Sequence, residues 1–166
     1  VRRGYLVAGL GGAQFATSGA IDRLRAVATE PTRMAPTNAF PVALAATDPA
    51  NPYGTLLPWP ATPAGASRPT RAAGAVVVLV NGRLVWYVAR GGRALTSWPA
   101  SDEDLHAAAA ALAGLLRAVP HARSSRIRIE RVNAESAQSS KPGQALQAVG
   151  FAPTPAGLRW RDTGNG

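Results

Sequence analysis

Apolar and polar positions follow two patterns along the chain, one typical of strands and the other of helices. The clearest strand signal is a pair of apolar runs, 75–80 and 83–90, which flank the dipeptide Asn81-Gly82. Asn-Gly between two such runs favours a β-hairpin with a type I′ turn. Shorter apolar or alternating runs predict further strands at 5–8, 40–46, 94–97, 126–132 and 158–161.

Three stretches have apolar residues at helical spacing, and each follows a residue that can cap a helix. A hydroxyl at the cap accepts a hydrogen bond from a first-turn N–H group. The pairs of cap and helix are Thr17 or Ser18 with 19–27, Ser101 with 102–119, and Ser139 or Ser140 with 142–149. The fold class predicted is α+β, with a mostly antiparallel, barrel-like β-sheet and about three peripheral helices. The sheet includes a meander that contains the Asn-Gly hairpin.

Prolines interrupt these patterns between residues 55 and 74. Pro58, Pro60, Pro63 and Pro69 rule out a helix there and disfavour a central strand. We therefore expect a Pro-rich loop, loosely held over 61–67, within a single domain that spans 1–166. Strand-like sequence begins within a few residues of the first position, so we expect this domain to be a piece of a longer chain.

The charge balance points to a class of partner. Eighteen residues are Lys or Arg and nine are Asp or Glu, which gives a net charge of +9. Such a surface favours a polyanion, and nucleic acid is the default partner. No cysteine is present, so disulfides, thiolate metal sites and a cysteine nucleophile are excluded. The longest apolar run is far shorter than the ~20 residues of a membrane span, so we expect no membrane partner.

No cofactor or metal site is expected in this piece. It contains no Gly-x-x-x-x-Gly-Lys-[Ser/Thr] motif, so any ATP hydrolysis belongs elsewhere. The glycine loop 9–12 lies where a dinucleotide fingerprint would lie, but Gln14 replaces its third small residue. That loop is either a tight connection or a place where backbone amides hold one phosphate. His106 and His121 have no second ligand at a metal-type spacing.

The candidate nucleic-acid-binding residues are mostly arginines. Arg126 and Arg128 share one face of the predicted 126–132 strand, opposite Ile127 and Ile129. That face is either a stripe that follows phosphates or a solvated sheet surface. Tyr53 is the aromatic candidate, because its ring could stack on an unpaired base. The full set is Arg2, Arg3, Arg23, Arg25, Arg71, Arg126, Arg128, Arg131 and Tyr53.

Asp48 stands between an apolar run and a double-proline turn. Its side chain either closes an Asx-turn with nearby backbone amides or supports chemistry on a base or sugar. Excision of a base needs base flipping, together with a carboxylate or amide that stabilises the sugar cation or orients water. Asp48, Gln14 and Asn51 are therefore the candidate catalytic residues.

Several blocks of sequence carry a resemblance to a known family. They are RGYLVAGLGGAQFA at 3–16, GAIDRLR at 19–25, LAATDPANPYG at 44–54, LPWP at 57–60, RP at 68–69 with RAAGAVVVLVNG at 71–82, and GFAPTPAGLR at 150–159. Together they resemble the far C-terminal region of the large helicase-related (Lhr) family over nearly the whole chain. The resemblance implies bacterial and archaeal DNA-dependent ATPases of helicase superfamily 2 that are implicated in DNA repair.

The resemblance also implies a division of labour within a longer, cytoplasmic and nucleoid-associated protein. The motor, with its ATP and Mg²⁺, lies in the N-terminal half of such proteins, and winged-helix modules and a β-barrel-like module follow it. The C-terminal part is similar to bacterial DNA glycosylases, which use two glutamines that flank one residue. Because Gln14 stands alone, no catalytic residue transfers to this chain.

We therefore carry three hypotheses. The first is a non-motor DNA-binding accessory domain at the C-terminus of an ATP-dependent DNA helicase, in contact with DNA and with winged-helix modules of the same chain. The alternative is part of a glycosylase-like module that excises damaged bases. A second alternative is a docking or oligomerisation module, for which a homo-oligomer is the expected assembly.

Overall fold

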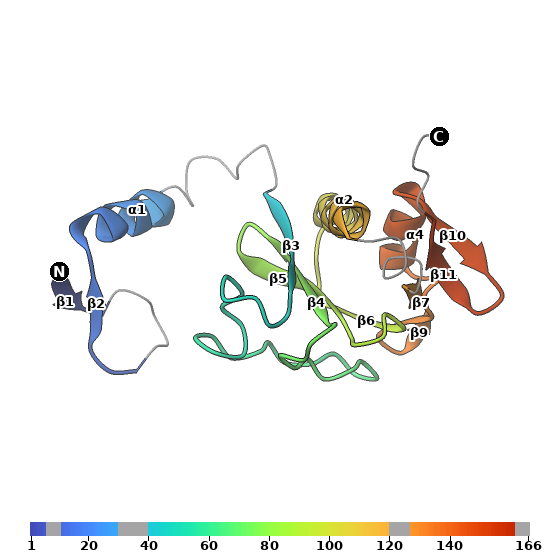
Figure 1. Ribbon diagram of the computed structural model, residues 1–166, viewed down its shortest axis with the longest axis horizontal. Coiled ribbons are helices and arrows are strands. Elements are labelled where there is room, and N and C mark those ends of the chain that lie inside the picture. Colours follow the sequence, from blue (N-terminus) through green and yellow to red (C-terminus); the bar gives the residue numbers. More distant parts are fainter. Residues whose placement is uncertain (6–10, 30–39, 120–126, 162–166) are drawn as a thin grey trace.

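The computed structural model describes residues 1–5, 11–29, 40–119 and 127–161 (Figure 1). Within these ranges the strands are β1 (Arg2–Gly4), β2 (Gln14–Ala16), β3 (Pro41–Ala45), β4 (Val76–Val80), β5 (Arg83–Val88), β6 (Ala94–Ser97), β7 (Arg128–Ile129), β8 (Arg131–Val132), β9 (Glu135–Ser136), β10 (Phe151–Thr154) and β11 (Gly157–Trp160). The helices are α1 (Ser18–Thr29), α2 (Asp102–Ala118) and α4 (Lys141–Ala148). Helices occur together with mostly antiparallel sheets, which confirms the α+β class.

A six-stranded sheet is built around the predicted hairpin. Its order is β3-β4-β5-β6-β8-β9, and the β6–β8 pair is parallel whereas the others are antiparallel. Asn81 at φ 51° and Gly82 at φ 77° form the left-handed pair that the predicted type I′ turn requires. A barrel closes when its first and last strands pair. In the described ranges β3 and β9 stay at opposite edges of an open sheet, so the barrel-like part of the prediction is not confirmed.

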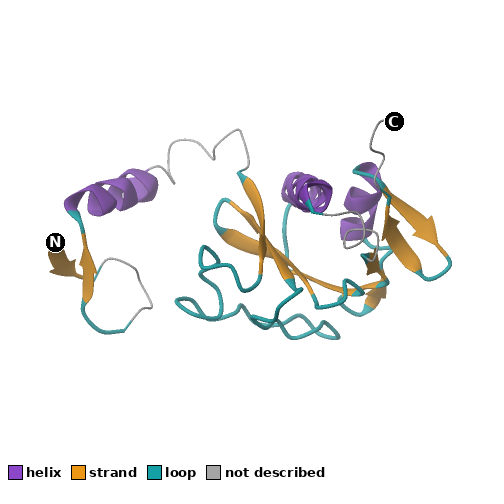
Figure 2. Cartoon of the chain, viewed as in Figure 1, coloured by secondary structure: helices purple, strands orange, loops and turns teal. Residues whose placement is uncertain are grey.

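Both faces of β4 and β5 are buried, which explains why β4 is an uninterrupted apolar run. Val78 and Trp86 belong to a cluster that includes the buried residues of α2, whereas Val77 and Tyr87 pack with Trp59 of the Pro-rich loop. Figure 2 shows α2 on one side of the sheet and the loop on the other. A strand covered on both faces has no need for polar positions.

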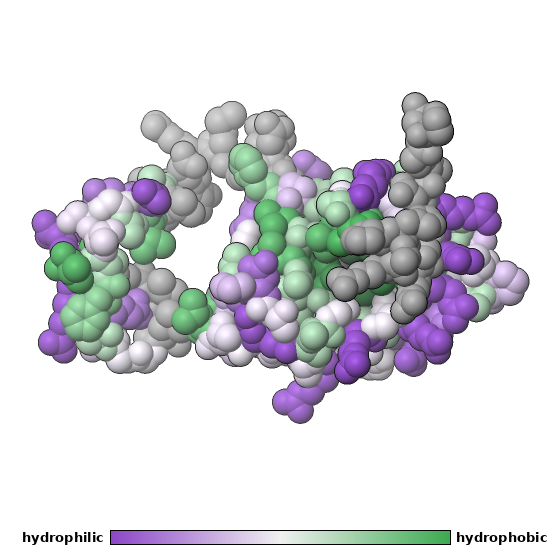
Figure 3. Space-filling model, in the orientation of Figure 1, coloured by the Kyte–Doolittle hydropathy of each residue, from purple (hydrophilic) through white to green (hydrophobic). Residues whose placement is uncertain are grey.

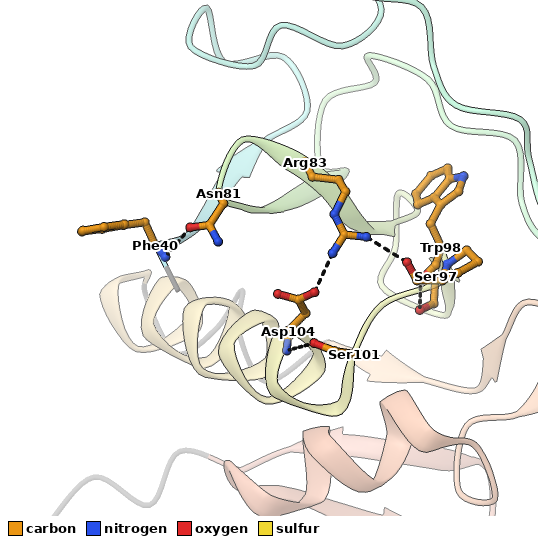
Figure 4. A network of polar contacts seen from close by, with 8 residues as sticks. Phe40, Asn81, Arg83, Ser97, Trp98, Ser101 and Asp104 are labelled. Atoms are coloured by element: carbon orange, nitrogen blue, oxygen red, sulfur yellow. Dashed lines mark hydrogen bonds and ion pairs between the residues drawn. The ribbon is translucent and has the colours of Figure 1, made fainter. Parts of the chain in front are cut away.

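The start of α2 is tied to the tip of the hairpin. Ser101 caps the helix, as predicted, because its Oγ accepts a hydrogen bond of 3.1 Å from Asp104 N. Arg83 forms an ion pair with the Asp104 carboxylate and donates to the carbonyl oxygen of Pro99 at 3.0 Å (Figure 4). Three acidic residues in the first turn of α2 also suit the positive end of the helix dipole. None of the helices within the described ranges is both long and apolar enough to cross a bilayer.

The Pro-rich loop is held to the sheet along its length, contrary to our expectation for 61–67. Trp98 Nε1 donates to the carbonyl oxygen of Ala61 at 2.9 Å, and Thr96 Oγ1 donates to that of Ser67 at 2.7 Å. Gly65, at φ 71°, lies so close to Ala134 that a Cβ there would stand 2.6 Å from the Ala134 methyl group. The loop therefore packs as a second cover for the sheet.

A second, three-stranded sheet has the order β10-β11-β7 and meets α4 on one side. We call it the small sheet. Helix α4 begins at the predicted cap Ser140, whose Oγ accepts a hydrogen bond of 3.1 Å from Gly143 N. Gly143 has no room for a side chain, because a Cβ would stand 1.6 Å from the carbonyl oxygen of Ala137.

The strand predicted over 126–132 is divided between the two sheets. β7 pairs with β11 in the small sheet, and β8 pairs with β6 in the large one. Glu130 lies between them, and its N–H donates to the carbonyl oxygen of Arg93 at 2.8 Å. The break at Glu130 falls where the alternation of apolar and charged residues slips, because Glu130 and Arg131 are two charged residues in a row.

The N-terminal hairpin and helix form a separate group of elements. β1 and β2 pair in antiparallel fashion, and α1 follows directly. β1 covers Arg2–Gly4, whereas most of the strand predicted at 5–8 lies outside the described ranges, which omit 6–10, so it stays a prediction. Tyr5, Phe15 and Leu24 are large apolar residues that are exposed here, and apolar surface is visible on this part of the molecule (Figure 3).

Candidate nucleic-acid interface

Four exposed arginines lie on the N-terminal hairpin and helix, and we call them the N-terminal arginines. Arg2 and Arg3 are on β1, and Arg23 and Arg25 are on α1. Arg2 and Arg3 leave opposite sides of the hairpin, because successive strand residues point to opposite faces. The Arg25 guanidinium lies 3.9 Å from the Asp22 carboxylate, but the two side chains are 75% and 72% exposed, so their ion pair is weak. A ligand can therefore meet most of this charge from solvent.

A second group of arginines lies on the outer face of the small sheet. Arg128 of β7 and Arg159 of β11 stand directly opposite each other in the antiparallel pairing. The residues beside them in sequence, Ile129, Leu158 and Trp160, are buried on the other face, toward α4. Because strand side chains alternate between faces, the two arginines point away from that core.

One carboxylate serves two of the arginines near this face. Arg128 donates to Glu130 Oε1 from Nε at 3.1 Å and from Nη2 at 2.6 Å, and Arg93 Nε lies 3.7 Å from the same oxygen. The side chains of Arg131, Arg159 and Arg161 are exposed, and their guanidinium groups make no hydrogen bond or ion pair with other described residues. Glu130 is thus shared by Arg93 and Arg128, and Arg159 opposite Arg128 adds a positive charge that no described carboxylate neutralises.

The structure rearranges the predicted arginine stripe. Arg126 lies outside the described ranges, and Arg131 belongs to the large sheet rather than to the strand of Arg128. The residue opposite Arg128 is Arg159, which the sequence analysis missed together with Arg161. A signal for both was present, because Leu-Arg-Trp-Arg at 158–161 alternates apolar and cationic residues in a predicted strand.

Arg71, a predicted DNA contact, is engaged inside the fold. Its guanidinium donates to four backbone carbonyl oxygens, those of Thr47 at 3.1 Å, Asp48 at 3.0 Å, Asn51 at 2.8 Å and Tyr53 at 3.1 Å. These carbonyls all belong to the turn that follows β3. The arrangement gives Arg71 the role of a structural tie, so its charge is already used by the protein.

The catalytic candidates Asp48 and Asn51 lie in that same turn. Asp48 Oδ1 accepts a hydrogen bond of 2.8 Å from Ala50 N, which is the Asx-turn considered from the sequence. Asn51 is fully buried, donates from Nδ2 to the carbonyl oxygen of Ala46 at 2.9 Å and accepts from Tyr53 N at 3.1 Å. The nitrogen and the oxygen of the Asn51 side-chain amide are therefore both hydrogen-bonded. Asp48 is half-buried, and its second carboxylate oxygen remains available.

Tyr53, the predicted stacking residue, is also held by the fold. Its hydroxyl donates to the carbonyl oxygen of Gly82 at 3.3 Å and accepts from Leu84 N at 3.2 Å. Its ring stacks on Trp59, with 6.2 Å between ring centroids and an interplanar angle of 22°. The tyrosine links the Pro-rich loop to the hairpin turn, and one of its ring faces is taken by the tryptophan.

The structure does not join Gln14 to the other catalytic candidates in one turn. Gln14 is half-buried on β2, opposite Gly4 of β1, whereas Asp48 and Asn51 follow β3. Open cavities lie on the part of the chain described over 40–119 and 127–161, and two of them contain aromatic and cationic side chains. One of about 520 Å³ is lined in part by Trp98, Asn133 and Lys141, and one of about 630 Å³ by Trp59, Arg68 and three prolines. Within the described ranges no group of three or more His, Asp or Glu side chains is placed to hold a metal ion.

Comparisons with known proteins bear on this interface. Residues 1–36 match the family model "Large helicase-related protein, winged-helix domain". Over 96% of its length the chain is 45% identical to the "Lhr helicase/ probable uracil glycosylase" of Mycolicibacterium smegmatis and 43% identical to the "Lhr helicase/uracil glycosylase" of Escherichia coli. The resemblance to the Lhr family is confirmed. The chain spans only 11% and 10% of the lengths of these two Lhr relatives.

The match to the winged-helix model includes one group of arginines and leaves out the other. The N-terminal arginines all lie within the segment that matches the winged-helix model. The arginines of the small sheet lie beyond it, in a part of the chain whose two buried clusters contain only residues after 40. Any contact that this second group makes therefore depends on a different core.

Proposed function

We propose that this chain is a DNA-binding accessory part of an Lhr-type helicase and does not contain the motor. The observation that carries the proposal is that Arg2, Arg3, Arg23 and Arg25 are exposed within the segment that matches a winged-helix domain. Arginine–phosphate pairs are charge-assisted, and they release counterions from DNA. Contacts of this kind fix position on the duplex and carry no base sequence information.

In the longer protein, this part would hold DNA while other domains act. ATP and Mg²⁺ would be used by motor domains outside this chain, in a protein that works in DNA repair in the cytoplasm. The neighbours of this part within the same protein would be further winged-helix modules. We propose that the accessory role covers all 166 residues, with the N-terminal arginines as the first point of contact with DNA.

The proposal is tested by salt-dependent DNA binding. Fluorescence anisotropy of a fluorescein-labelled duplex gives Kd across 50 to 200 mM salt for the parent chain and for Arg2→Ala/Arg3→Ala. Each phosphate contact adds about 0.9 to the slope of log K against log salt. Because Arg2 and Arg3 leave opposite faces of the hairpin, the variant should lose at least one contact, and its affinity should fall at least about 3.5-fold less over this range than that of the parent chain.

A matched control removes the same charge elsewhere. Arg68 and Lys141 are both exposed and lie outside the N-terminal elements, so Arg68→Ala/Lys141→Ala also lowers the net charge by two. This control should keep a slope within about 0.5 of that of the parent, because it removes no phosphate contact. Equal slopes for the two double variants would show that net charge alone drives binding, and the winged-helix assignment of the contact would fail.

The names of both relatives favour a second candidate function, excision of uracil from DNA. Asp48 is the residue that the geometry leaves available, because Asn51 is fully engaged and the second carboxylate oxygen of Asp48 makes no contact with other described residues. That oxygen would orient water or stabilise a developing sugar cation.

The excision candidate is tested by release of uracil from a labelled strand, detected by alkaline cleavage. Asp48→Asn keeps the size of the side chain and removes its charge, and Asp22→Asn is the control on the exposed face of α1. A chain that releases uracil equally well with Asp48→Asn does not use this carboxylate, and activity lost in both variants points to a general effect of charge.

A further inference from the structure

We infer that the outer face of the small sheet is a second nucleic-acid site, which takes the phosphodiester backbone of duplex DNA. The residues that carry it are Arg128, Arg159 and Arg161. The inference takes its class of ligand from the proposed function, but it uses none of the residues on which that proposal depends.

The first observation is a pair of like charges at one position of the sheet. Arg128 and Arg159 are directly opposite in the antiparallel register of β7 and β11. Like charges in this arrangement destabilise a sheet, and side chains there are only about 5 Å apart at Cβ. Glu130 neutralises Arg128 alone of the two, while Arg159 has no partner within the described ranges. An anion between or above the two guanidinium groups would remove the repulsion.

The second observation is the spacing along β11. Arg159 lies on β11 and Arg161 directly follows its last residue, Trp160, which is 2% exposed on the opposite face; Arg161 N–H continues the strand pairing by donating to the carbonyl oxygen of Gly150 at 3.4 Å. The side chains of Arg159 and Arg161 therefore leave the same face, about 6.6 Å apart along the strand. That separation is comparable with the distance between neighbouring phosphates on one strand of DNA, so each guanidinium can meet its own phosphate.

The third observation is what this face lacks. Its remaining positions on β10 and β11 are Ala152, Thr154 and Gly157, which are small. Protein interfaces have an apolar core, and this face offers no large apolar side chain from which to build one. Single strands are held by stacking on aromatic rings, but Phe151 and Trp160 are buried on the other face. The phosphodiester backbone of a duplex can be bound by positive charge on an accessible surface, without apolar or aromatic side chains.

Glu130 gives this face a fixed donor geometry. Arg128 uses Nε and one Nη nitrogen for the carboxylate, so the other terminal nitrogen keeps its hydrogens for a ligand. The chain around Glu130 is itself fixed, since its N–H donates to Arg93 O and Gly157 packs against its backbone. An arginine held in this way loses little side-chain freedom on binding. Hydrophilic residues are also visible at the end of the molecule that carries β10 and β11 (Figure 3).

The experiment compares three double variants of the whole chain on one duplex. Arg159→Ala/Arg161→Ala removes the proposed site, Arg2→Ala/Arg3→Ala removes part of the N-terminal arginines, and Arg68→Ala/Lys141→Ala is the control with the same loss of charge. Kd for a fluorescein-labelled duplex is measured from 50 to 200 mM salt. Two lost contacts should lower the slope by about 1.8, so the affinity of the variant should fall about 12-fold less between 50 and 200 mM salt than that of the parent chain.

The outcomes separate this inference from the proposed function. A reduced slope for Arg159→Ala/Arg161→Ala, with the control unchanged, supports the second site whatever the N-terminal variant does. A reduced slope for the N-terminal variant alone leaves the proposed function standing and overturns the second site. The second site would also be overturned if the parent chain bound a single strand more tightly than a duplex of equal length and Arg159→Ala/Arg161→Ala lost that preference. The proposed face has no aromatic ring on which bases could stack.

Folding is checked in the same samples. The side chains of Arg159 and Arg161 are exposed and have no hydrogen-bond or ion-pair partner among the described residues, so the double variant should melt at or above the temperature of the parent chain. A melting temperature that falls well below that of the Arg68→Ala/Lys141→Ala control would mean that the two arginines support the sheet itself, and the inference would be wrong.

Discussion

Replacement of Arg71 by alanine is the most direct test of how this protein divides its arginines. The substitution removes four hydrogen bonds to the turn after β3, those to Thr47, Asp48, Asn51 and Tyr53. A hydrogen bond from a charged donor contributes about 1.5 kcal/mol at the low end of its range, so four additive bonds would give ~6 kcal/mol. Bonds that share one guanidinium are not additive, and Arg71 is only half-buried, so we expect about 3 kcal/mol.

The expected loss is large enough to measure by thermal unfolding. For a domain of this size each kcal/mol shifts Tm by about 2–4 °C, which predicts a Tm lower by about 6–12 °C for Arg71→Ala. The Tm of Arg71→Lys should lie between those of the parent chain and Arg71→Ala, because a lysine ammonium has three donors and no planar fork to match four carbonyls. Arg68→Ala is the control from the same loop, and it should stay within about 0.5 kcal/mol of the parent.

Two results would refute this reasoning. If Arg71→Ala and Arg68→Ala have the same Tm, the four hydrogen bonds of Arg71 contribute nothing to stability. If Arg71→Ala remains folded at the assay temperature and lowers the slope of DNA binding against salt while Arg68→Ala does not, then Arg71 contacts phosphate after all. The first result would reject the structural role of Arg71, and the second would support the DNA contact predicted from the sequence.

Three further predictions concern the scaffold and are checked by thermal or chemical unfolding. Gly143→Ala should prevent folding or lower stability by more than about 3 kcal/mol, because its Cβ would overlap the Ala137 carbonyl, whereas Gly114→Ala in open space on α2 should stabilise by up to about 1 kcal/mol. Ser101→Ala should cost about 1 kcal/mol through loss of the α2 cap. Gly82→Ala should destabilise by more than about 1 kcal/mol, since φ there is 77°. An unchanged Gly143→Ala protein would contradict the close packing of α4.

The local signals of the sequence predicted the local parts of the fold. Asn81-Gly82, Ser101 and Ser140 each act on backbone within four residues, so the hairpin turn and both helix starts were found at the right places. The capping residue and the turn dipeptide determine these features whatever packs around them. The prediction that 1–166 forms a single domain stays a prediction.

The features that were missed depend on contacts between distant residues. The 126–132 stretch divides because β7 pairs with β11, about 30 residues later in the chain, and β8 pairs with β6, 37 residues earlier. The Pro-rich loop is fixed by bonds from β6 and by close contact between Gly65 and Ala134. Propensity and periodicity describe only neighbours in sequence, so neither arrangement is visible to them.

The candidate site shows the same limit in a chemical form. Arg71 and Arg159 are the same residue type, and each lies among apolar and small residues in the sequence, yet their surroundings differ in what the guanidinium can still bind. Arg71 meets four carbonyls from a turn about 20 residues away, whereas Arg159 meets another arginine across the strand pair. The sequence therefore predicted a cationic protein correctly, but it did not say which cations remain available.

The net charge of +9 therefore overstates what a polyanion can use. Arg71 and Arg83 direct their donors to carbonyls or a carboxylate, and Arg117 lies over the Trp160 ring with 5.5 Å to its centroid. A guanidinium that is already bonded must lose those bonds to pair with phosphate, so it adds little to the counterions released on binding. The slope of affinity against salt should accordingly match the number of exposed, unbonded arginines that touch DNA, and not the formal charge of the chain.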